Sequence, residues 1–467
     1  MASALAQSAS ATAPRIRMWT SPKPAPAPSN VSDLKQLARQ IFYETLAAID
    51  IPLAMRQKLA RTGSLIRFDD TVVDLAAYDR IVAIAVGKAS VAMAQGFADL
   101  LATDFAFEGI LVAPHESLSD VQGFRALAAA HPIPDTSSTA AAHAIIDLLS
   151  QCDSRTLVFF LLSGGGSSLI ELPLDPGVSL ENLQQLNRVL VTSGASINEI
   201  NAVRKHLSAV KGGRLAALAA ASMKLSLAIT DVPAGCESAL ASGPTLPDPT
   251  TIADACRVIE KYDLASKLPA SIRAKFAHPT STPETPKPGH PAFARARFSL
   301  LLTMHDLFHH AHQAAESRGF LTQCDNSSDD WPSARAAEYL LGQLDRLAHA
   351  VPGRRVALIA DGEVSSPVRG NGLGGRNSAF VLDCVERIAG KGIAVLSAGT
   401  DGKDGSSPAA GALADGTTLE RARAETLDPR EFAVRSDSYS FFHKLGDAIE
   451  TGPTGNNLRD LRILLAE

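Results

Sequence analysis

The sequence has few cysteines, no excess of basic residues and no long apolar run, and each absence excludes a class of protein. Its 467 residues include five widely spaced cysteines without Cys-x-x-Cys spacing, which argues against a disulfide framework and a zinc site. Lysine and arginine total 44 against 49 acidic residues, a formal net charge of −5, so no nucleic-acid partner is expected. No apolar run approaches the roughly 18 residues of a membrane span. These absences favour a reducing compartment and no membrane contact.

Length and composition indicate a globular chain of more than one domain. At roughly 150 residues per domain, 467 residues predict two or three domains. The 46% hydrophobic and 20% charged composition is typical of soluble globular proteins. Residues 1–32 contain no acid and are rich in Ala, Ser and Pro, which is typical of a disordered tail and also of an organelle transit peptide. We expect a cytoplasmic protein, or a mitochondrial one if this segment is a transit peptide.

Apolar runs alternate with helical patterns in two series, which predicts an α/β fold. The first series, over 33–276, has a helix from Leu34 and strands expected at 80–86, 109–114, 156–162 and 224–230. Residues 277–297 are rich in proline and are expected to be an exposed linker. The second series, over 298–467, has strands expected at 298–303, 354–360 and 392–398, with helices near 304–318, 333–349 and 378–389. Two domains, each a mostly parallel sheet flanked by helices, would place an active site in the cleft between them.

The stretch 157–173, "LVFFLLSGGGSSLIELP", runs from a buried strand pattern into glycines and serines. Glycines at the carboxyl end of a parallel strand let backbone N–H groups approach an anion. We therefore expect a phosphate-binding turn made of Ser163, Gly164, Gly165, Gly166, Ser167 and Ser168. The alternative is a tight turn that serves only close backbone packing.

Several cations fall close to predicted strand ends. Lys88 follows the strand at 80–86 and could reach phosphate oxygens, although this is not a P-loop, because Ala89 replaces the serine or threonine. Arg204, His206 and Lys211 lie near one another in 198–216 and suggest anion binding. The alternative in both cases is a solvated surface charge.

Carboxylates also follow predicted strands. Asp231 comes directly after the strand at 224–230 and could orient a hydroxyl, accept its proton or hold Mg²⁺. Asp401 and Asp404 lie among glycines after the strand at 392–398 and suit a divalent cation or a polyol hydroxyl. Helix caps and ordinary turns are the alternative interpretation.

A glycine-rich loop at 370–375 satisfies Gly-x-Gly-x-x-Gly literally through Gly370, Gly372 and Gly375. The dinucleotide interpretation fails, because the loop does not begin at the end of a strand. We predict instead a flexible loop that carries Arg369 and Arg376, with Arg376 able to grip a carboxylate or phosphate. Glycine-rich loops, cations and carboxylates at strand ends together favour phosphoryl transfer.

The chain resembles the glycerate 2-kinase family, which has a large N-terminal domain and a C-terminal MOFRL domain. The resemblance covers about residues 34–464 through "GKAS", "HPIPDTSS", "SGGGSSLIELP", "NAVRKHLSAVKGGRLA", "DVPAGCESALASGPT", "GNGLGGRN", "AGTDGKDG", "DSYSFFHKLGD" and "TGPTGNNLRDL". It implies ATP- and Mg²⁺-dependent phosphorylation of D-glycerate at the 2-hydroxyl.

The resemblance also implies roles for single residues. Lys88 would neutralise the transferring phosphate, Asp231 would engage the glycerate hydroxyl and Arg376 would bind charge on substrate or phosphate. The turn at 163–168 and Lys211 would bind the nucleotide, and Asp401 would be a metal ligand.

The chain departs from the family pattern at Ser378, Ala379 and Pro408, where the family usually has acidic or amide residues. Each lost carboxylate or amide removes a possible metal or hydroxyl contact, so the departures bear on the substrate. An NAD(P)H-dependent hydroxypyruvate reductase and a non-catalytic nucleotide-binding relative are the alternative functions, and a homo-oligomer is possible.

Overall fold

The computed structural model describes residues 34–101, 104–230, 237–456 and 458–467. The predicted tail at 1–32 and Asp231 lie outside these described residues. None of the described helices is long and apolar enough to cross a membrane.

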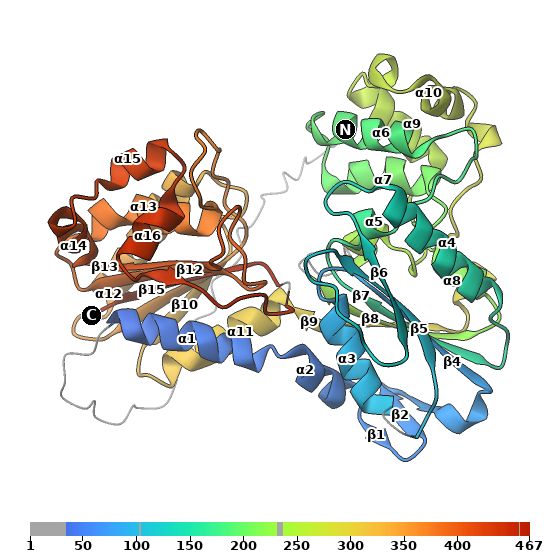
Figure 1. The fold of residues 1–467 in the computed structure, drawn as a ribbon, viewed down its shortest axis with the longest axis horizontal. Helices are drawn as coiled ribbons and strands as arrows, with labels where there is room; N and C mark the ends of the chain where they lie inside the picture. The colour runs from blue at the N-terminus through green and yellow to red at the C-terminus, as the bar shows by residue number, and fades with distance from the viewer. Residues whose placement is uncertain (1–33, 102–103, 231–236, 457) are drawn as a thin grey trace, which may run out of the picture. The chain divides into compact units, whose positions relative to one another are not determined.

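The first large sheet is wholly parallel, as the strand pattern predicts (Figure 1). Its strands, in spatial order, are β6 (Phe124–Ala129), β5 (Glu108–Pro114), β4 (Arg80–Val86), β7 (Thr156–Leu162), β8 (Met223–Thr230) and β9 (Ala296–Thr303). Every residue of β7 and β8 is buried, because helices cover both faces of the sheet.

Helices surround this sheet in two layers. One face is covered by α2 (Ile51–Lys58) and α3 (Ser90–Leu101), and the other by α4 (Thr136–Ser150), α5 (Gly166–Leu169) and α8 (Arg214–Leu218). A separate helical core is formed by α6 (Leu180–Val191), α7 (Ile197–Leu207), α9 (Ile252–Lys261) and α10 (Ala270–Ala277). A small antiparallel sheet is formed by β1 (Arg61–Thr62), β2 (Leu65–Phe68) and β3 (Thr71–Asp74).

Short 3-10 helices occur at η1 (Leu75–Ala77), η2 (Glu237–Ser242), η3 (Ala265–Lys267), η4 (Pro279–Ser281) and η5 (Pro291–Phe293). The last two lie in the segment expected to be an exposed linker. There Thr285 is 2% exposed and donates a hydrogen bond to Asp248 Oδ2 at 2.9 Å, and Ala292 is fully buried. The segment is thus anchored at Thr285 and Ala292, while Pro283, Pro288 and Pro291 are exposed, and its role as a linker between domains stays a prediction.

The second large sheet is mixed, so the prediction of a mostly parallel sheet is wrong for it. Its spatial order is β10 (Leu321–Asp325), β11 (Val356–Asp361), β15 (Asp460–Ala466), β12 (Ile393–Gly399), β13 (Gly411–Asp415) and β14 (Ala448–Ile449). Only β10 and β11 pair in parallel, since β15 enters between β11 and β12 and runs antiparallel to both. The strand expected to open this series, at 298–303, is β9 and pairs with β8 in the first sheet.

Helices cover both faces of the second sheet as well. One face packs against α1 (Leu34–Ala48) and α11 (Met304–Glu316), and the other against α12 (Ser333–Ala350) and α13 (Arg376–Ile388). The short helices α14 (Thr418–Ala424), α15 (Pro429–Val434) and α16 (Ser438–Lys444) complete this side. The first helix of the chain thus packs on the strands of the second sheet (Figure 1).

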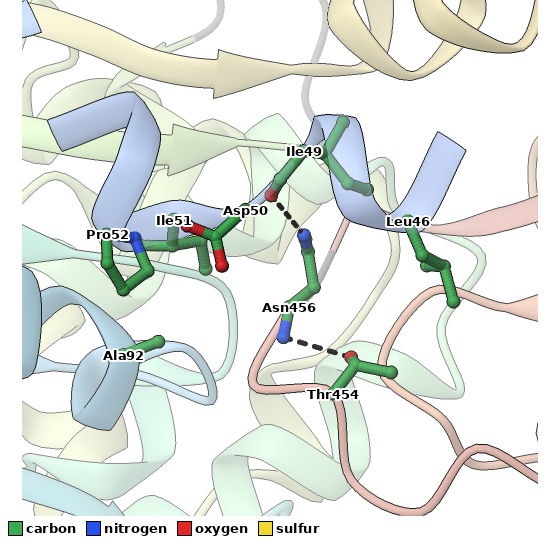
Figure 2. A pocket seen from close by; sticks show the side chains of 8 residues that line it. All are labelled: Leu46, Ile49, Asp50, Ile51, Pro52, Ala92, Thr454 and Asn456. Atoms are coloured by element: carbon green, nitrogen blue, oxygen red, sulfur yellow. Dashed lines mark hydrogen bonds between the residues drawn. The ribbon is translucent and has the colours of Figure 1, made fainter. Parts of the chain in front are cut away.

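The junction between α1 and α2 is held by the loop that precedes β15 (Figure 2). Asn456 donates through Nδ2 to the Ile49 carbonyl at 2.8 Å, and its backbone N–H donates to Thr454 Oγ1 at 3.1 Å. Together with Asp50 and Ala92 these residues line a cavity of about 60 Å³. A water molecule needs about 10–15 Å³ of such space, so this cavity has room for a few waters.

Candidate active site at the glycine-rich turn

The strand order of the first sheet reverses between β4 and β7, which lie side by side at its centre. Ligands of open α/β sheets bind at the carboxyl ends of the strands at such a switch point. Lys88 follows β4, and the turn at 163–168 follows β7, so the fold brings these two predicted features together. The Lys88 N–H donates to the Gly164 carbonyl at 2.9 Å. A Cβ on Gly87 would lie 2.6 Å from the Ser163 carbonyl oxygen, so only glycine fits there.

The turn itself presents backbone N–H groups. Gly165 has a φ of 85°, a left-handed conformation that favours glycine. The N–H groups from Gly164 to Ser167 donate to no residue that the structure describes. Ser163 accepts a hydrogen bond from the Ala89 N–H at 3.0 Å, and Ser168 donates to the Gly165 carbonyl at 3.1 Å. These two serines therefore shape the turn, while the amides between them remain available to an anion.

Lys88 and His131 meet beside Gly165. A Cβ on that glycine would lie 3.1 Å from Lys88 Cγ and 3.2 Å from His131 Nε2. Lys88 is half-buried and forms no salt bridge with a carboxylate in the described chain. Burial and the Lys88 charge lower the pKa of His131, although Glu116 opposes them, and this favours the neutral imidazole. His131 could not be predicted from the sequence, because its position beside Gly165 depends on the fold of the loop after β6.

Lys211 supports the turn and does not face a ligand. Its side chain is 1% exposed, and Nζ donates to the Ser167 carbonyl and to Glu171 Oε2, both at 2.8 Å, and to the Ile170 carbonyl at 3.4 Å. The ammonium has three donors, so these bonds use all of them. Burial lowers the pKa of Lys211 to about 8 against the opposing charge of Glu171. The expectation that Lys211 contacts the nucleotide is corrected: it positions the turn.

The three cations expected to bind an anion together point in different directions. His206 is buried, with Nδ1 2.7 Å from the Ala202 carbonyl and Nε2 3.1 Å from Glu284 Oε2. Arg204 contacts the turn through a side chain, since its Nη2 donates to Ser167 Oγ at 2.9 Å. Of the three predicted cations, Arg204 thus bonds a side chain of the turn, while His206 and Lys211 are internal supports.

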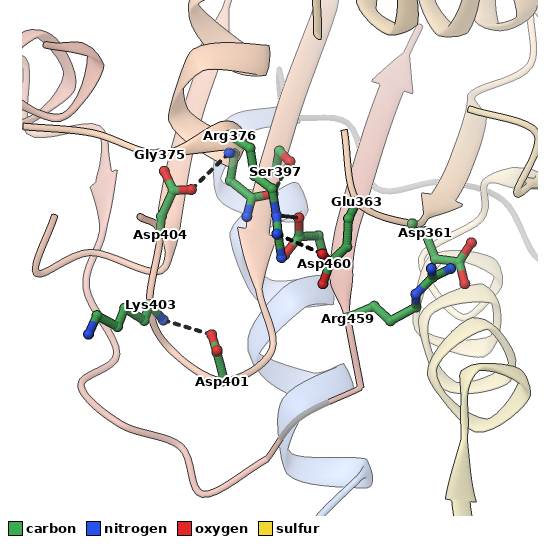
Figure 3. A network of polar contacts seen from close by, with 12 residues as sticks. Asp361, Glu363, Gly375, Arg376, Ser397, Asp401, Lys403, Asp404, Arg459 and Asp460 are labelled. Atoms are coloured by element: carbon green, nitrogen blue, oxygen red, sulfur yellow. Dashed lines mark hydrogen bonds and ion pairs between the residues drawn. The ribbon is translucent and has the colours of Figure 1, made fainter. Parts of the chain in front are cut away.

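Arg376, the first residue of α13, is fixed by two carboxylates (Figure 3). Its Nε and Nη2 donate to Asp460 at 2.6 and 3.1 Å, and Nη1 donates to Glu363 Oε2 at 2.7 Å. Burial alone would lower the pKa of Arg376, but these carboxylates raise it above the ordinary value. An anion that reached Arg376 would meet a guanidinium already oriented by the protein.

The N-terminus of α13 is capped by Asp404, one of the two carboxylates predicted for a cation or a hydroxyl. Asp404 accepts from the N–H groups of Asn377 and Ser378, both at 2.9 Å, and from Ser378 Oγ at 2.6 Å. Burial raises the pKa of Asp404 although these hydrogen bonds oppose it. Ser378, where the family pattern has another residue, thus bonds the cap directly.

The loop at 370–375 is packed, so the expectation of a flexible loop is wrong. A Cβ on Gly370 would lie 2.5 Å from the Arg435 carbonyl oxygen, and a Cβ on Gly372 would collide with Asp437. These glycines permit close contact with the segment between α15 and α16.

The predicted metal ligand Asp401 accepts a hydrogen bond from the Lys403 N–H at 3.0 Å, which is ordinary turn geometry. Within the described ranges, no group of three His, Cys, Asp or Glu side chains is arranged to hold a metal ion. Asp401 therefore remains a prediction.

Asp361, at the end of β11, is a feature that the sequence analysis missed. It has no exposed surface, and neither carboxylate oxygen has a hydrogen-bond partner among the described residues. Burial raises its pKa to about 6, against the opposing charge of Arg459. A short polar side chain after an apolar run gives no signal of such burial.

Comparison with known proteins adds independent evidence. Residues 37–277 match DUF4147, described as a domain of unknown function, and residues 356–460 match the MOFRL family. The chain is 34% identical over 434 residues to the D-glycerate 2-kinase of Thermotoga maritima, covering 92% of this chain and 98% of that protein. It is also 34% identical over 436 residues to an Agrobacterium vitis protein provisionally named hydroxypyruvate reductase, covering 92% and 94%.

A solved structure of a glycerate kinase is also similar to this chain over nearly its whole length. The crystal structure of glycerate kinase from Thermotoga maritima matches with a TM-score of 0.79 at 34% identity, covering 93% of this chain and 99% of that one. A parallel sheet with a cationic glycine-rich turn at its switch point defines an α/β enzyme of anionic substrates. Within that class, the chain belongs to the glycerate 2-kinase family, which confirms the resemblance seen in the sequence.

Proposed function

We propose that this protein transfers the terminal phosphoryl group of ATP to the 2-hydroxyl of D-glycerate, giving 2-phosphoglycerate and ADP. Its family membership supports the reaction class, since the Thermotoga maritima relative is named D-glycerate 2-kinase. The observation that carries the proposal is that the N–H groups from Gly164 to Ser167, beside Lys88, have no partner among the described residues. Phosphoryl transfer depends mainly on positioning and on neutralising the charge of the transferred group, which these donors can do.

We assign the parts of the site as follows. The turn amides hold phosphate oxygens, and Lys88 neutralises charge on the transferred group. Arg376, oriented by Asp460 and Glu363, binds charge on substrate or phosphate. Asp231, outside the described residues, is proposed to engage the hydroxyl.

Magnesium fits this arrangement as a partner of the nucleotide. It binds phosphates together with one or two carboxylates and neutralises phosphate charge. Asp404, Asp460 and Glu363 are already bonded to helix α13 or to Arg376. Asp401 is the proposed protein ligand, and Asp231, the other carboxylate predicted as a possible ligand, lies outside the described residues.

The experiment is a coupled ADP-release assay with ATP, Mg²⁺ and D-glycerate on the wild type, Lys88→Ala and Lys267→Ala. Lys267 is exposed on η3 and serves as the matched control. Loss of Lys88 should lower kcat by about 10²–10³, the effect of removing one preorganised charge-stabilising group. Phosphorus NMR of the product distinguishes phosphorylation at the 2-hydroxyl from phosphorylation at the 3-hydroxyl. Equal turnover by wild type and Lys88→Ala would refute the assignment of Lys88.

The reductase alternative has less support. A dinucleotide-binding turn of this sheet would need several glycines directly after β4, and the sequence there is Val-Gly-Lys-Ala-Ser. Mixing the protein with NADH and hydroxypyruvate and following NADH absorbance tests it directly. Oxidation of NADH without ADP release from the kinase mixture would favour the reductase.

A further inference from the structure

Helix α7 presents Asn201 and Arg204 to the glycine-rich turn from one face, since the two residues are three positions apart. Arg204 Nη2 donates to Ser167 Oγ at 2.9 Å, and Ser167 Oγ lies 2.9 Å from Ser242 Oγ. Ser242 in turn donates to Asn201 Oδ1 at 2.9 Å. The chain of bonds starts and ends on the same helix and passes through the turn.

The direction of these bonds follows from the donors available. Ser242 gives its one proton to Asn201, so Ser167 must donate to Ser242 and accept from Arg204. Ser242 and Ala241 both have left-handed backbones, with φ of 60° and 48°. Such conformations are costly for residues with a Cβ and are concentrated at functional sites. The backbone is thus strained to place a hydroxyl that fixes Ser167 and, through it, Arg204.

The charge of Arg204 is not balanced by any carboxylate of the described chain. Glu171 is the acidic residue near enough to influence it, but Glu171 bonds Lys211 Nζ at 2.8 Å and Ser208 Oγ at 2.6 Å. The guanidinium is largely buried, and its Nε has no partner among the described residues. Burial lowers the pKa of Arg204 because it disfavours the charged form. A cation kept in this environment without a counter-ion is suited to receive an anion from outside.

We propose that Arg204 binds the carboxylate of the 2-hydroxy acid substrate, an inference that rests on the proposed function. A planar guanidinium matches a carboxylate in a two-point contact, whereas the lysine at the other end of the turn acts as a point charge on phosphate. The carboxylate and the 2-hydroxyl of such an acid are on neighbouring carbons. Gripping the carboxylate at Ser167 therefore sets the hydroxyl beside the turn that holds the phosphate. Arg204 would make the enzyme select hydroxy acids over neutral polyols.

The test compares wild type, Arg204→Gln, Arg204→Lys and Arg188→Gln, which changes an exposed arginine on α6 as a matched control. We expect Arg204→Gln to raise the KM for D-glycerate by about 30- to 100-fold, the loss expected for a charged hydrogen bond. Its KM for ATP should change less than threefold. Arg204→Lys should recover part of the loss, and the control should match the wild type. A rise in the KM for ATP with an unchanged KM for D-glycerate would overturn the proposal and assign Arg204 to the nucleotide.

A binding measurement separates this proposal from the proposed function and from a purely structural role. D-glycerate and D-lactate, each added without ATP, should raise the Tm of the wild type and of Arg188→Gln but not of Arg204→Gln. Without ligand, Arg204→Gln should keep or raise the wild-type Tm, because it removes a buried charge that has no counter-ion, whereas loss of a structural arginine would lower the Tm. If the wild type shows the ligand-induced shift but releases no ADP, the kinase proposal fails and the carboxylate site stands. If no hydroxy acid shifts the wild-type Tm, the carboxylate site is wrong.

Discussion

Replacing Asp361 by asparagine should make the protein more stable, and the gain should grow from pH 5 to pH 8. Asp361 is fully buried at the end of β11, and both carboxylate oxygens lack a hydrogen-bond partner in the described part of the chain. Arg462 donates to the backbone carbonyls of Asp361 and Gly362, at 3.0 and 2.8 Å, and not to the carboxylate. Burying an acceptor that accepts nothing is costly, and more so when it is charged.

The magnitude follows from the pKa of Asp361. Burial raises it from 3.8 to about 6, although the charges of Arg459, Arg462 and His305 oppose the shift and Asp329 adds to it. Because the folded-state pKa is the higher one, the folded protein loses stability as pH rises from about 4 to about 6, and the loss is then constant. A shift of roughly two units, at about 1.4 kcal/mol per unit, gives about 3 kcal/mol at pH 8 and about half of that at pH 5.

Urea unfolding of wild type and Asp361→Asn at pH 5 and pH 8 measures this difference. The control is Asp329→Asn, because Asp329 accepts hydrogen bonds from Arg459 at 2.7 Å and from the Glu363 N–H at 2.8 Å. The control should lose about 1–3 kcal/mol, the usual effect of removing a hydrogen-bonded charge. If Asp361→Asn raised the free energy of unfolding equally at the two pH values, the reasoning would be refuted. Ionisation of the buried carboxylate would then not be what destabilises the wild type.

Three further substitutions test the site and its supports. Gly165→Ala places a Cβ at a φ of 85°, and should lower kcat at least tenfold and stability by about 1–2 kcal/mol; unchanged kcat would show that the turn is not used. Glu171→Gln leaves the buried ammonium of Lys211 without its counter-ion and should cost about 3–5 kcal/mol in urea unfolding, whereas a loss below 1 kcal/mol would contradict the pairing. Asp460→Asn removes a two-point contact to Arg376 and should lower kcat while leaving Tm nearly unchanged. Kinetics and melting curves on one preparation measure the two effects.

The parts of the fold that could be predicted are the strands whose burial is indicated by a run of consecutive apolar residues. Strands β4 and β7 were predicted with the bounds the structure gives, because both faces of the parallel sheet are covered. Strand β15 was missed although every residue of it is buried, since Asp460 and Arg462 interrupt its apolar pattern. Asp460 pairs with Arg376, and Arg462 donates to the carbonyls of Asp361 and Gly362, and these partners lie too far away in the sequence for a local pattern to reveal them.

In the candidate site, too, some residues could be predicted from the sequence and others could not. Three glycines after a buried strand, and one lysine after its neighbour, were enough to predict that the turn and Lys88 lie together, because parallel strands end at one edge of the sheet. The roles of Lys211 and His131 could not be predicted. The first depends on which carbonyls surround a buried ammonium, and the second on which loop crosses the turn. Spacing in the sequence brought Arg204 and His206 together, but their helix turns them to different neighbours.

Helix α1 has a consequence for how the protein can be divided. It covers strands β12 and β15, and its Lys35 forms a 2.6 Å ion pair with Asp447, so both extremes of the described chain build one core. A fragment that starts at β9 lacks α1 and would expose an apolar face of the second sheet to solvent. Such a half should be recovered in soluble form only when a peptide covering residues 34–48 is supplied alongside it.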